Sequence, residues 1–384
     1  MHSITRVPGA GVSPPDALSD VDEEAAALIR EARQRQRRRW LVAAVAVVVS
    51  VAAVVATAVF AGSGSGSRAR PSPSSQTEPI APALAPALVT VSATHLPKGG
   101  AYHLASGFHA VWVTGIGVTY EISQTSGRIL RTIATPGTFP DGCGGGVAAG
   151  AGAVWVTHGC RGVYRIDPRS GRITASLRVP NAGGSIAVAG GLVWVTNYFG
   201  NLLRIQPRTD HIVGKPIAVG GGDWALALGA GALWVSSYGG GGPGPYPWTV
   251  ARIDLATGRV RHLRHLADVV AVGAGSLWTS YVRRVDPATG KVLASINVPG
   301  VYPAVVAFWR GSAWALEEIP YSIRIVRIDP ATNRVTGSPV LVGKPLTARF
   351  FTDPTAMTAG PTGLWVLDYN RQLLFHLAPP SAAP

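Results

Sequence analysis

Short apolar segments and polar turns alternate along most of the chain in a fixed order. A Gly/Ala/Val-rich run, as at 186–189, is followed by an apolar run centred on tryptophan, as at 193–196, and then by an Arg-Ile segment, as at 203–205. Other copies of the third segment read Arg-Ile-Asp-Pro, as at 165–168. The runs are short, rich in β-branched residues and bounded by Gly, Pro, Asp and Ser, which is typical of strands. The chain therefore predicts many short strands joined by tight turns.

This group of segments recurs seven times, each time with one tryptophan in the same local frame. The tryptophans lie roughly 40 residues apart, a period that is typical of a β-propeller when each copy holds several strands. We expect four strands per copy: an innermost small-residue strand, the tryptophan strand, the Arg-Ile-Asp strand, and an outermost strand after a Thr-Gly or Ser-Gly turn. One small sheet cannot bury both of its faces, so the copies must stack with the indoles between them. The seven residues are Trp112, Trp155, Trp194, Trp234, Trp278, Trp314 and Trp365.

Two incomplete pieces at the ends of the repeat region complement each other. The last copy stops after the strand at 373–377, whereas 88–94 is a lone alternating strand with no copy of its own. If this N-terminal strand joins the last copy, the ring closes and no sheet edge is left exposed there. The sequence therefore predicts an all-β, seven-bladed β-propeller over 87–379, followed by a tail at 380–384.

A membrane anchor is predicted before the propeller. Residues 41–61 carry no charge and are almost all Ala and Val, enough helix to span roughly 30 Å of hydrocarbon. Arginines precede the run, and Trp40 lies at its boundary. The positive-inside rule then places 1–39 in the cytoplasm and the propeller outside the cell membrane, with 40–61 as a single-pass transmembrane helix.

The segments on either side of the anchor differ in character. We expect 1–39 to be disordered at first and then helical, because acids gather at the start of its second half and arginines at the end. Residues 62–86 are rich in Gly, Ser and Pro and predict a tether. A cleaved signal peptide is the alternative, since Val59-x-Ala61 resembles a processing site.

The net charge of +14, from 34 Lys+Arg and 20 Asp+Glu, falls mostly on the repeat region. The arginines are spread over the copies and form no basic block with interleaved aromatics, so we expect no nucleic-acid partner. A positive surface raises affinity for anionic surfaces in general. We therefore expect the partner to be an envelope protein or an anionic cell-wall polymer.

The repeats resemble those of the YncE/YVTN family of bacterial seven-bladed propellers and, more loosely, the NHL and virginiamycin B lyase-like propellers. The likeness covers 88–379 and rests on the Ala-Val-Gly strands, the Leu-Trp-Val strands and turns such as Ile-Asp-Leu-Ala-Thr-Gly at 253–258. It implies a secreted or cell-surface protein that binds or scaffolds. The lyase-like branch implies a Trp-Phe-Thr-Glu run with a metal-assisted site, whereas 155–158 and 194–197 here read Trp-Val-Thr-His and Trp-Val-Thr-Asn.

Cys143 and Cys160 are the only cysteines, and both fall in loops of the second copy that emerge on the same face. Because disulfides persist outside the cytoplasm, we expect a Cys143–Cys160 bond. Two free buried thiols are the alternative.

Polar and aromatic residues gather where the second strand of each copy is expected to end. Seven-fold repetition would place them in a ring at the mouth of the central channel, which makes them candidates for a ligand site. The alternative is that loop ends are polar only because they are solvated. The candidates are His158, Asn197, Tyr198, Tyr238, Tyr281, Glu317, Glu318, Asp368 and Tyr369.

We expect no catalytic residue, metal site or cofactor. The histidine and the carboxylates of this ring belong to different copies, too far apart for direct proton transfer. The predicted function is a membrane-anchored, extracytoplasmic binding or scaffold module for an envelope protein, a cell-wall polymer or a small ligand. The alternative is an envelope enzyme of the streptogramin lyase-like type, with a metal at the propeller mouth. A third possibility is a wall-anchoring element that meets anionic polymers through its charge.

Overall fold

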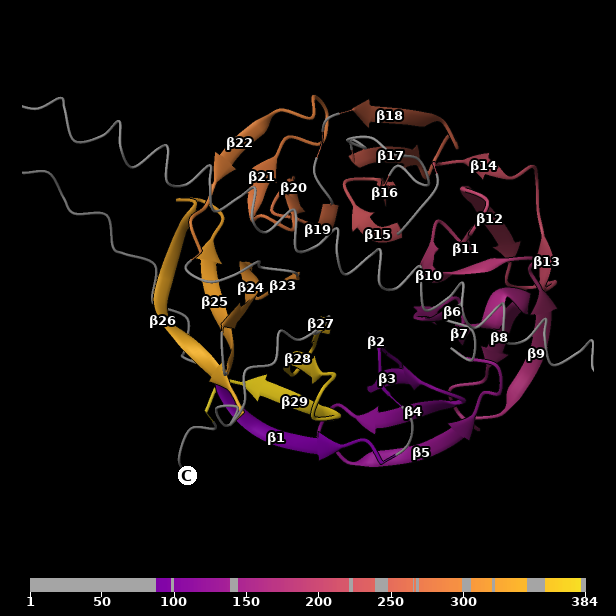
Figure 1. The fold of residues 1–384 in the computed structure, drawn as a ribbon, viewed down its shortest axis with the longest axis horizontal. Coiled ribbons are helices and arrows are strands. Elements are labelled where there is room, and N and C mark those ends of the chain that lie inside the picture. The colour runs from indigo at the N-terminus through magenta and orange to yellow at the C-terminus, as the bar shows by residue number, and fades with distance from the viewer. Residues whose placement is uncertain are drawn as a thin grey trace, which may run out of the picture. The chain divides into compact units, whose positions relative to one another are not determined.

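Seven small antiparallel sheets surround a common centre in the computed structural model of the chain (Figure 1). The structure describes residues 88–97, 100–138, 144–220, 224–238, 248–264, 266, 269–298, 305–319, 322–343 and 356–380. The predicted cytoplasmic segment, transmembrane helix and tether lie outside these ranges and stay predictions. Among the described residues, no helix is long and apolar enough to cross a bilayer.

The seven blades repeat one strand order from the centre of the ring to its edge. The innermost strands are β2 (His103–Gly107), β6 (Gly144–Gly150), β10 (Ala182–Ala189), β15 (Trp224–Gly229), β19 (Val269–Gly273), β23 (Val306–Trp309) and β27 (Ala356–Gly360). The second strands are β3 (Ala110–Gly115), β7 (Ala153–His158), β11 (Leu192–Asn197), β16 (Ala232–Tyr238), β20 (Ser276–Thr279), β24 (Ser312–Ile319) and β28 (Gly363–Asp368). The third strands are β4 (Val118–Ser123), β8 (Gly162–Ile166), β12 (Asn201–Gln206), β17 (Trp248–Asp254), β21 (Arg283–Val285), β25 (Ser322–Asp329) and β29 (Leu373–Ala378). The outer strands are β5 (Ile129–Ala134), β9 (Ile173–Arg178), β13 (His211–Ile212) with β14 (Ile217–Ala218), β18 (Val260–Arg264), β22 (Val292–Ser295), β26 (Arg334–Val342) and β1 (Val89–His95). A 3-10 turn, η1 (Gly159–Arg161), follows β7.

The predicted all-β, seven-bladed propeller is therefore confirmed, and we number the blades from β2–β5 as blade one. The last blade contains both ends of the ring, because β1 pairs antiparallel with β29. Val89 pairs with Ala378 and His95 with Leu373. Figure 1 shows β1 as the outermost strand beside β29. This pairing supplies the outer strand that the last copy lacks.

The propeller has two faces, which we name by their connections. The loop face carries the hairpins between second and third strands. The turn face carries the hairpins between first and second strands and the turns between third and outer strands. Each third strand runs from the loop face to the turn face, so Val89, beside Ala378, lies at the turn face.

The repeat tryptophans hold neighbouring blades together. Trp112 packs against Val147 and Val154 of blade two, and Trp155 packs against Val193 of blade three. Five of the seven indole side chains are completely buried and the other two nearly so. Six of the indole N–H groups donate to the carbonyl five residues earlier, at 3.0–3.4 Å. Truncating such a side chain to alanine costs about 3–5 kcal/mol.

The aspartates of the Asp-Pro-x-Thr-Gly turns organise the turn face. The Asp286 carboxylate accepts the backbone N–H groups of Ala288 and Thr289, at 2.8 and 2.7 Å. These backbone hydrogen bonds lower the pKa of Asp286. Gly290 follows with φ +74°, in the left-handed region that favours glycine. The pKa values of the equivalent aspartates are lowered in the same way; these are Asp167, Asp254 and Asp329.

Arginines join adjacent blades at the turn face. The Arg284 side chain of blade five donates to Pro330 O of blade six at 2.6 Å and to Asn333 Oδ1 at 3.1 Å. Arg131 of blade one pairs with Glu121 and donates to Arg169 O of blade two at 2.6 Å. Much of the arginine content therefore serves the fold, because the planar guanidinium can reach several acceptors at once.

Candidate functional site

The predicted ring residues lie at the loop face, but they do not all end a strand. His158, Asn197 and Asp368 are the last residues of their second strands, as predicted. For Tyr281 and Glu317 this prediction is wrong: Tyr281 follows the shorter β20, and Glu317 lies inside β24. The hairpin of blade six is longer, with Glu317 opposite Arg324 and Ile319 opposite Ser322.

His158 is packed into its own blade. Only 8% of the residue is exposed, and its ring stacks on Tyr164, with centroids 3.8 Å apart and planes 16° apart. Burial lowers the pKa of His158, and the positive charge of Arg161 adds to the effect. The ring is therefore neutral at pH 7, and its buried Nε2 has no hydrogen-bond partner.

Asn197 shapes the hairpin that follows it. Its Oδ1 accepts the backbone N–H groups of Phe199 and Asn201, at 3.2 and 3.0 Å. The residue is 6% exposed. An amide that caps its own turn in this way is a structural group.

Both described carboxylates of the ring are buried and paired with an arginine of the same blade. Glu317 is 1% exposed, and its Oε2 lies 2.8 Å from Arg324 Nη2. Asp368 is also 1% exposed; it accepts the backbone N–H of Arg371 at 3.0 Å and pairs with that residue's Nε. These two acids and His158 each stabilise a separate hairpin.

The alternative of a metal-assisted enzyme requires a cluster of metal ligands at the propeller mouth. Within the described ranges, no group of three or more His, Cys, Asp and Glu side chains is placed to hold a metal ion. Tyr238 and Glu318 lie in β16 and β24, but their side chains fall outside the described part.

The exposed residues of the loop face include large aromatic and apolar side chains, beside polar ones such as Arg161, Arg283 and Asn370. Phe199 is 70% exposed, and Tyr198 and Tyr281 are about half exposed, at 44% and 52%. Ile116, at the tip of the β3–β4 hairpin, is 48% exposed. Sequence reasoning found the two tyrosines but missed Phe199 and Ile116. Their signal was a large apolar residue at a hairpin tip, where small or polar residues are usual.

Basic and phenolic groups accompany this apolar set. The guanidinium of Arg283 lies 5.9 Å from the centroid of the Tyr281 ring. Tyr369 belongs to a tyrosine pair at the junction of blades seven and one, where its hydroxyl lies 3.0 Å from that of Tyr102. Burial, followed by this hydrogen bond, raises the pKa of Tyr102 to about 12.

Cys160, in η1, is disulfide-bonded. Its predicted partner Cys143 lies outside the described residues, so the pairing itself stays a prediction.

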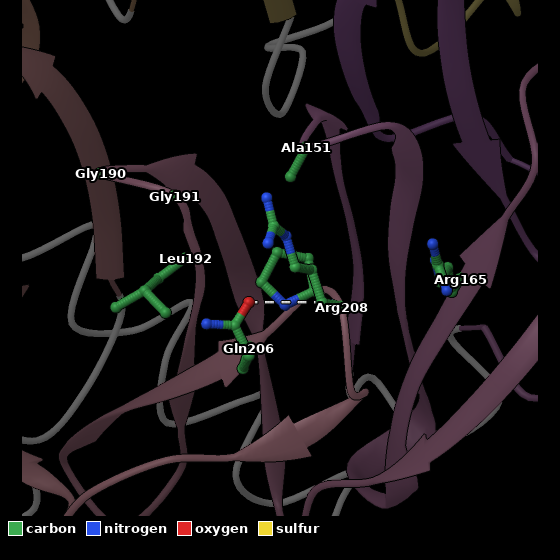
Figure 2. Close-up of a pocket in the computed structure, with 8 residues that line it drawn as sticks. Ala151, Arg165, Gly190, Gly191, Leu192, Gln206 and Arg208 are labelled. Atoms are coloured by element: carbon green, nitrogen blue, oxygen red, sulfur yellow. Dashed lines mark hydrogen bonds between the residues drawn. The ribbon is translucent and has the colours of Figure 1, made fainter.

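A cavity of about 780 Å³ lies between blades two and three at the turn face (Figure 2). In Figure 2 the Arg208 side chain rises beside Gln206, whose Oε1 accepts the Arg208 backbone N–H at 3.4 Å. Arg165, at the side of the cavity, pairs with Asp210 at 3.2 Å. Two blades contribute the wall, so no single repeat predicts it. The lining residues are Ala151, Arg165, Gly190, Gly191, Leu192, Gln206, Pro207 and Arg208.

Comparison with known proteins supports the architecture. No protein-family model matches the chain, and no curated protein matches it. Among solved structures, the crystal structure of BamB from Moraxella catarrhalis matches with a TM-score of 0.50 and 11% sequence identity, covering 76% of this chain and 100% of that one. At this identity the likeness shows the fold alone. The resemblance to the YncE/YVTN family stays a prediction, and what the comparisons establish is a β-propeller.

Proposed function

We propose that the chain is a membrane-anchored, extracytoplasmic binding or scaffold protein that holds an envelope protein at its loop face. The observation that carries this proposal is the contrast within that face. The two acids whose side chains are described, together with His158 and Asn197, are buried in local structure, whereas Phe199, Tyr281 and Ile116 are exposed.

Exposed aromatic residues beside arginines are the composition of protein interfaces. Tyr, Trp, Phe and Arg are enriched at the centre of such interfaces and dominate the affinity. Tyr198 and Phe199 provide adjacent aromatic rings on one hairpin, and Tyr281 carries Arg283 beside it. Ile116 adds an aliphatic side chain in blade one. A rigid propeller presents these side chains at fixed positions, which lowers the entropic cost of binding.

The location rests on the predicted anchor at 40–61 and on the redox state of Cys160. A disulfide-bonded cysteine is ordinary outside the cytoplasm and rare inside it. The positive-inside rule gives the same orientation.

The proposal is tested by co-purification of the full-length protein from its own detergent-solubilised membranes. We expect a discrete envelope protein to accompany the wild type. In Phe199→Ala and Tyr281→Ala, the recovered partner should fall by about tenfold or more, as for truncated interface anchors. Val91→Ala and Val91→Ser are matched controls, because they change an exposed aliphatic side chain on the outer strand β1 instead.

Equal recovery in the loop-face variants and the controls would refute the proposed contact. Recovery of a wall polymer or a small ligand, with no protein, would assign the face to that ligand instead. The thermal transition of each variant should match that of the wild type, so that lost binding cannot reflect unfolding.

A further inference from the structure

The turn face carries a repeated pairing of a basic residue with an exposed aliphatic residue. In each case the two residues stand at or just before the start of an outer strand. We call them the basic–aliphatic pairs. They are Arg128 with Leu130, Arg172 with Ile173, Arg259 with Val260, and Lys291 with Val292.

Two of the aliphatic members are about half exposed, and Ile173 and Val260 are exposed at 36% and 37%. Leu130 is 55% exposed and Val292 51%, and Leu293 next to it is 53% exposed. Ile212 gives blade three an exposed aliphatic residue at the position of Ile173, Val260 and Val292 in their blades. In blade one the exposed Leu130 stands one residue later than this position. Single exposed apolar residues are common on soluble proteins. Here exposed aliphatic residues recur on five consecutive blades, all at the turn face.

The charge of this face is positive in spite of its aspartates. Each aspartate of the Asp-Pro-x-Thr-Gly type turns is flanked by two basic residues, as Asp286 is by Arg284 and Lys291. Hydrogen bonds lower the pKa of each aspartate, so all four are charged at pH 7. Two cations against one anion leave at least one positive charge in each of these blades. The flanking pairs are Arg165 and Arg172, Arg252 and Arg259, Arg284 and Lys291, and Arg327 and Arg334.

The path of the chain brings its N-terminal side to the same face. β1 begins beside the turn-face end of β29, because Val89 pairs with Ala378. Whatever precedes Leu88 therefore leaves the propeller at the turn face. Upstream of it, the sequence predicts a tether at 62–86 and a membrane helix at 40–61.

We propose that the turn face lies on an anionic lipid bilayer, with the basic members of the pairs at the headgroup phosphates and the aliphatic members in the interface. Cations next to short aliphatic side chains suit this boundary, where electrostatic attraction and shallow apolar burial act together. A wall polymer would use the cations but would leave the aliphatic side chains in water. The cavity between blades two and three opens on the same face, with the exposed Arg208 at its wall. The inference does not depend on a protein partner at the loop face.

The test uses the full-length chain reconstituted in vesicles, with an environment-sensitive fluorophore on Val292→Cys. A second sample carries the fluorophore on Phe199→Cys at the loop face, and the wild type gives the labelling background. Vesicles of phosphatidylglycerol and of phosphatidylcholine each contain a lipid-borne quencher. We expect strong quenching at position 292 in phosphatidylglycerol, little in phosphatidylcholine, and little at position 199 in either. High salt should reverse the quenching, because it screens the headgroup charge.

A multiple variant tests whether the basic residues, and not only the membrane anchor, bring position 292 to the lipid. It carries the Val292→Cys change and has Gln in place of Arg128, Arg172, Arg259 and Lys291. Its quenching by phosphatidylglycerol should drop by more than about fivefold, and Leu130→Ser should lower it by less. If the multiple variant does not fold, the salt titration of the parent protein decides the question. Equal quenching at positions 292 and 199, or none at 292 in phosphatidylglycerol, would overturn the proposal. Protection of the label by soluble poly(glycerol phosphate) without quenching by lipid would overturn it in favour of a wall polymer.

Discussion

The two faces of the propeller use charge in opposite ways. At the loop face, the carboxylates of Glu317 and Asp368 are buried, and each stabilises a single hairpin. Large apolar side chains such as Phe199 are exposed there, beside cations such as Arg283. At the turn face, aspartates and arginines remain near the surface, and in five blades an arginine or lysine stands just before the outer strand or at its first residue. The difference shows that polar residues at strand ends do not by themselves mark a site; their burial and partners decide what remains for a ligand.

The largest expected effect concerns the buried ion pair of the loop face. Arg324→Ala leaves Glu317 buried without its counter-charge, so the free energy of unfolding should drop by about 3–5 kcal/mol. Denaturant titration measures this. The double variant Arg324→Met with Glu317→Leu should recover most of the loss. A drop below about 1 kcal/mol in the single variant would show that Glu317 is solvated.

A smaller loss is expected at the turn face. Arg284→Ala removes the bonds to Pro330 O and Asn333 between blades five and six and should cost about 1–3 kcal/mol. Arg284→Lys should not restore it, because an ammonium cannot bridge the same acceptors. Full rescue by lysine in the same titration would show that charge alone acts there.

The pH dependence of stability should distinguish the contribution of the buried histidines from that of the turn aspartates. Burial lowers the pKa of His158 and of His376, which stacks on Trp365 at 4.1 Å. Each neutral ring contributes stability that is complete above pH 6.5 and is lost as pH falls from there toward the lowered pKa. The stability that the turn aspartates contribute is complete above their ordinary pKa of 3.8 and is lost only as the pH falls below that value. The melting temperature should therefore decline between pH 7 and 5, and less so in the double variant His158→Gln with His376→Gln.

His103 provides a control for that experiment. His103 is exposed on β2, where solvent opposes the desolvation that lowers its pKa. Because an exposed residue keeps much of its hydration, we expect His103→Gln to change the slope of melting temperature against pH least. A larger change than in the double variant would place the main titration at the innermost strand.

The smallest effect on stability is expected where binding is proposed. Tyr281→Ser changes an exposed side chain and should alter the free energy of unfolding by no more than about 0.5 kcal/mol. A loss above 2 kcal/mol in denaturant titration would show that Tyr281 supports the fold rather than a partner.

The repeat makes the fold predictable, because the indole of every copy and the aspartate turn of four copies indicate the strands on either side. Trp155 and Asp286 each sit where their frame predicts, in a second strand and in a turn. The exposure of the candidate site was not predictable in the same way. Whether Glu317 faces water depends on the length of the β24–β25 hairpin and on Arg324 across it, and neither follows from the distance to a tryptophan.

The turn-face cavity could not be predicted either, since Arg165 and Arg208 line it together only after two blades have stacked. Phe199 could have been predicted from the sequence. A hairpin tip is exposed and needs no large aromatic side chain for its structure, so a phenylalanine there indicates another role.

A pair of photo-crosslinkers tests the division between the faces most directly. A benzophenone side chain replaces Phe199 in one full-length protein and Val292 in another. Each protein is expressed in the organism that naturally makes it, and the intact cells are irradiated. The account predicts a discrete protein adduct from position 199 and lipid adducts from position 292. The same protein adduct from both positions, or lipid from position 199, would contradict it.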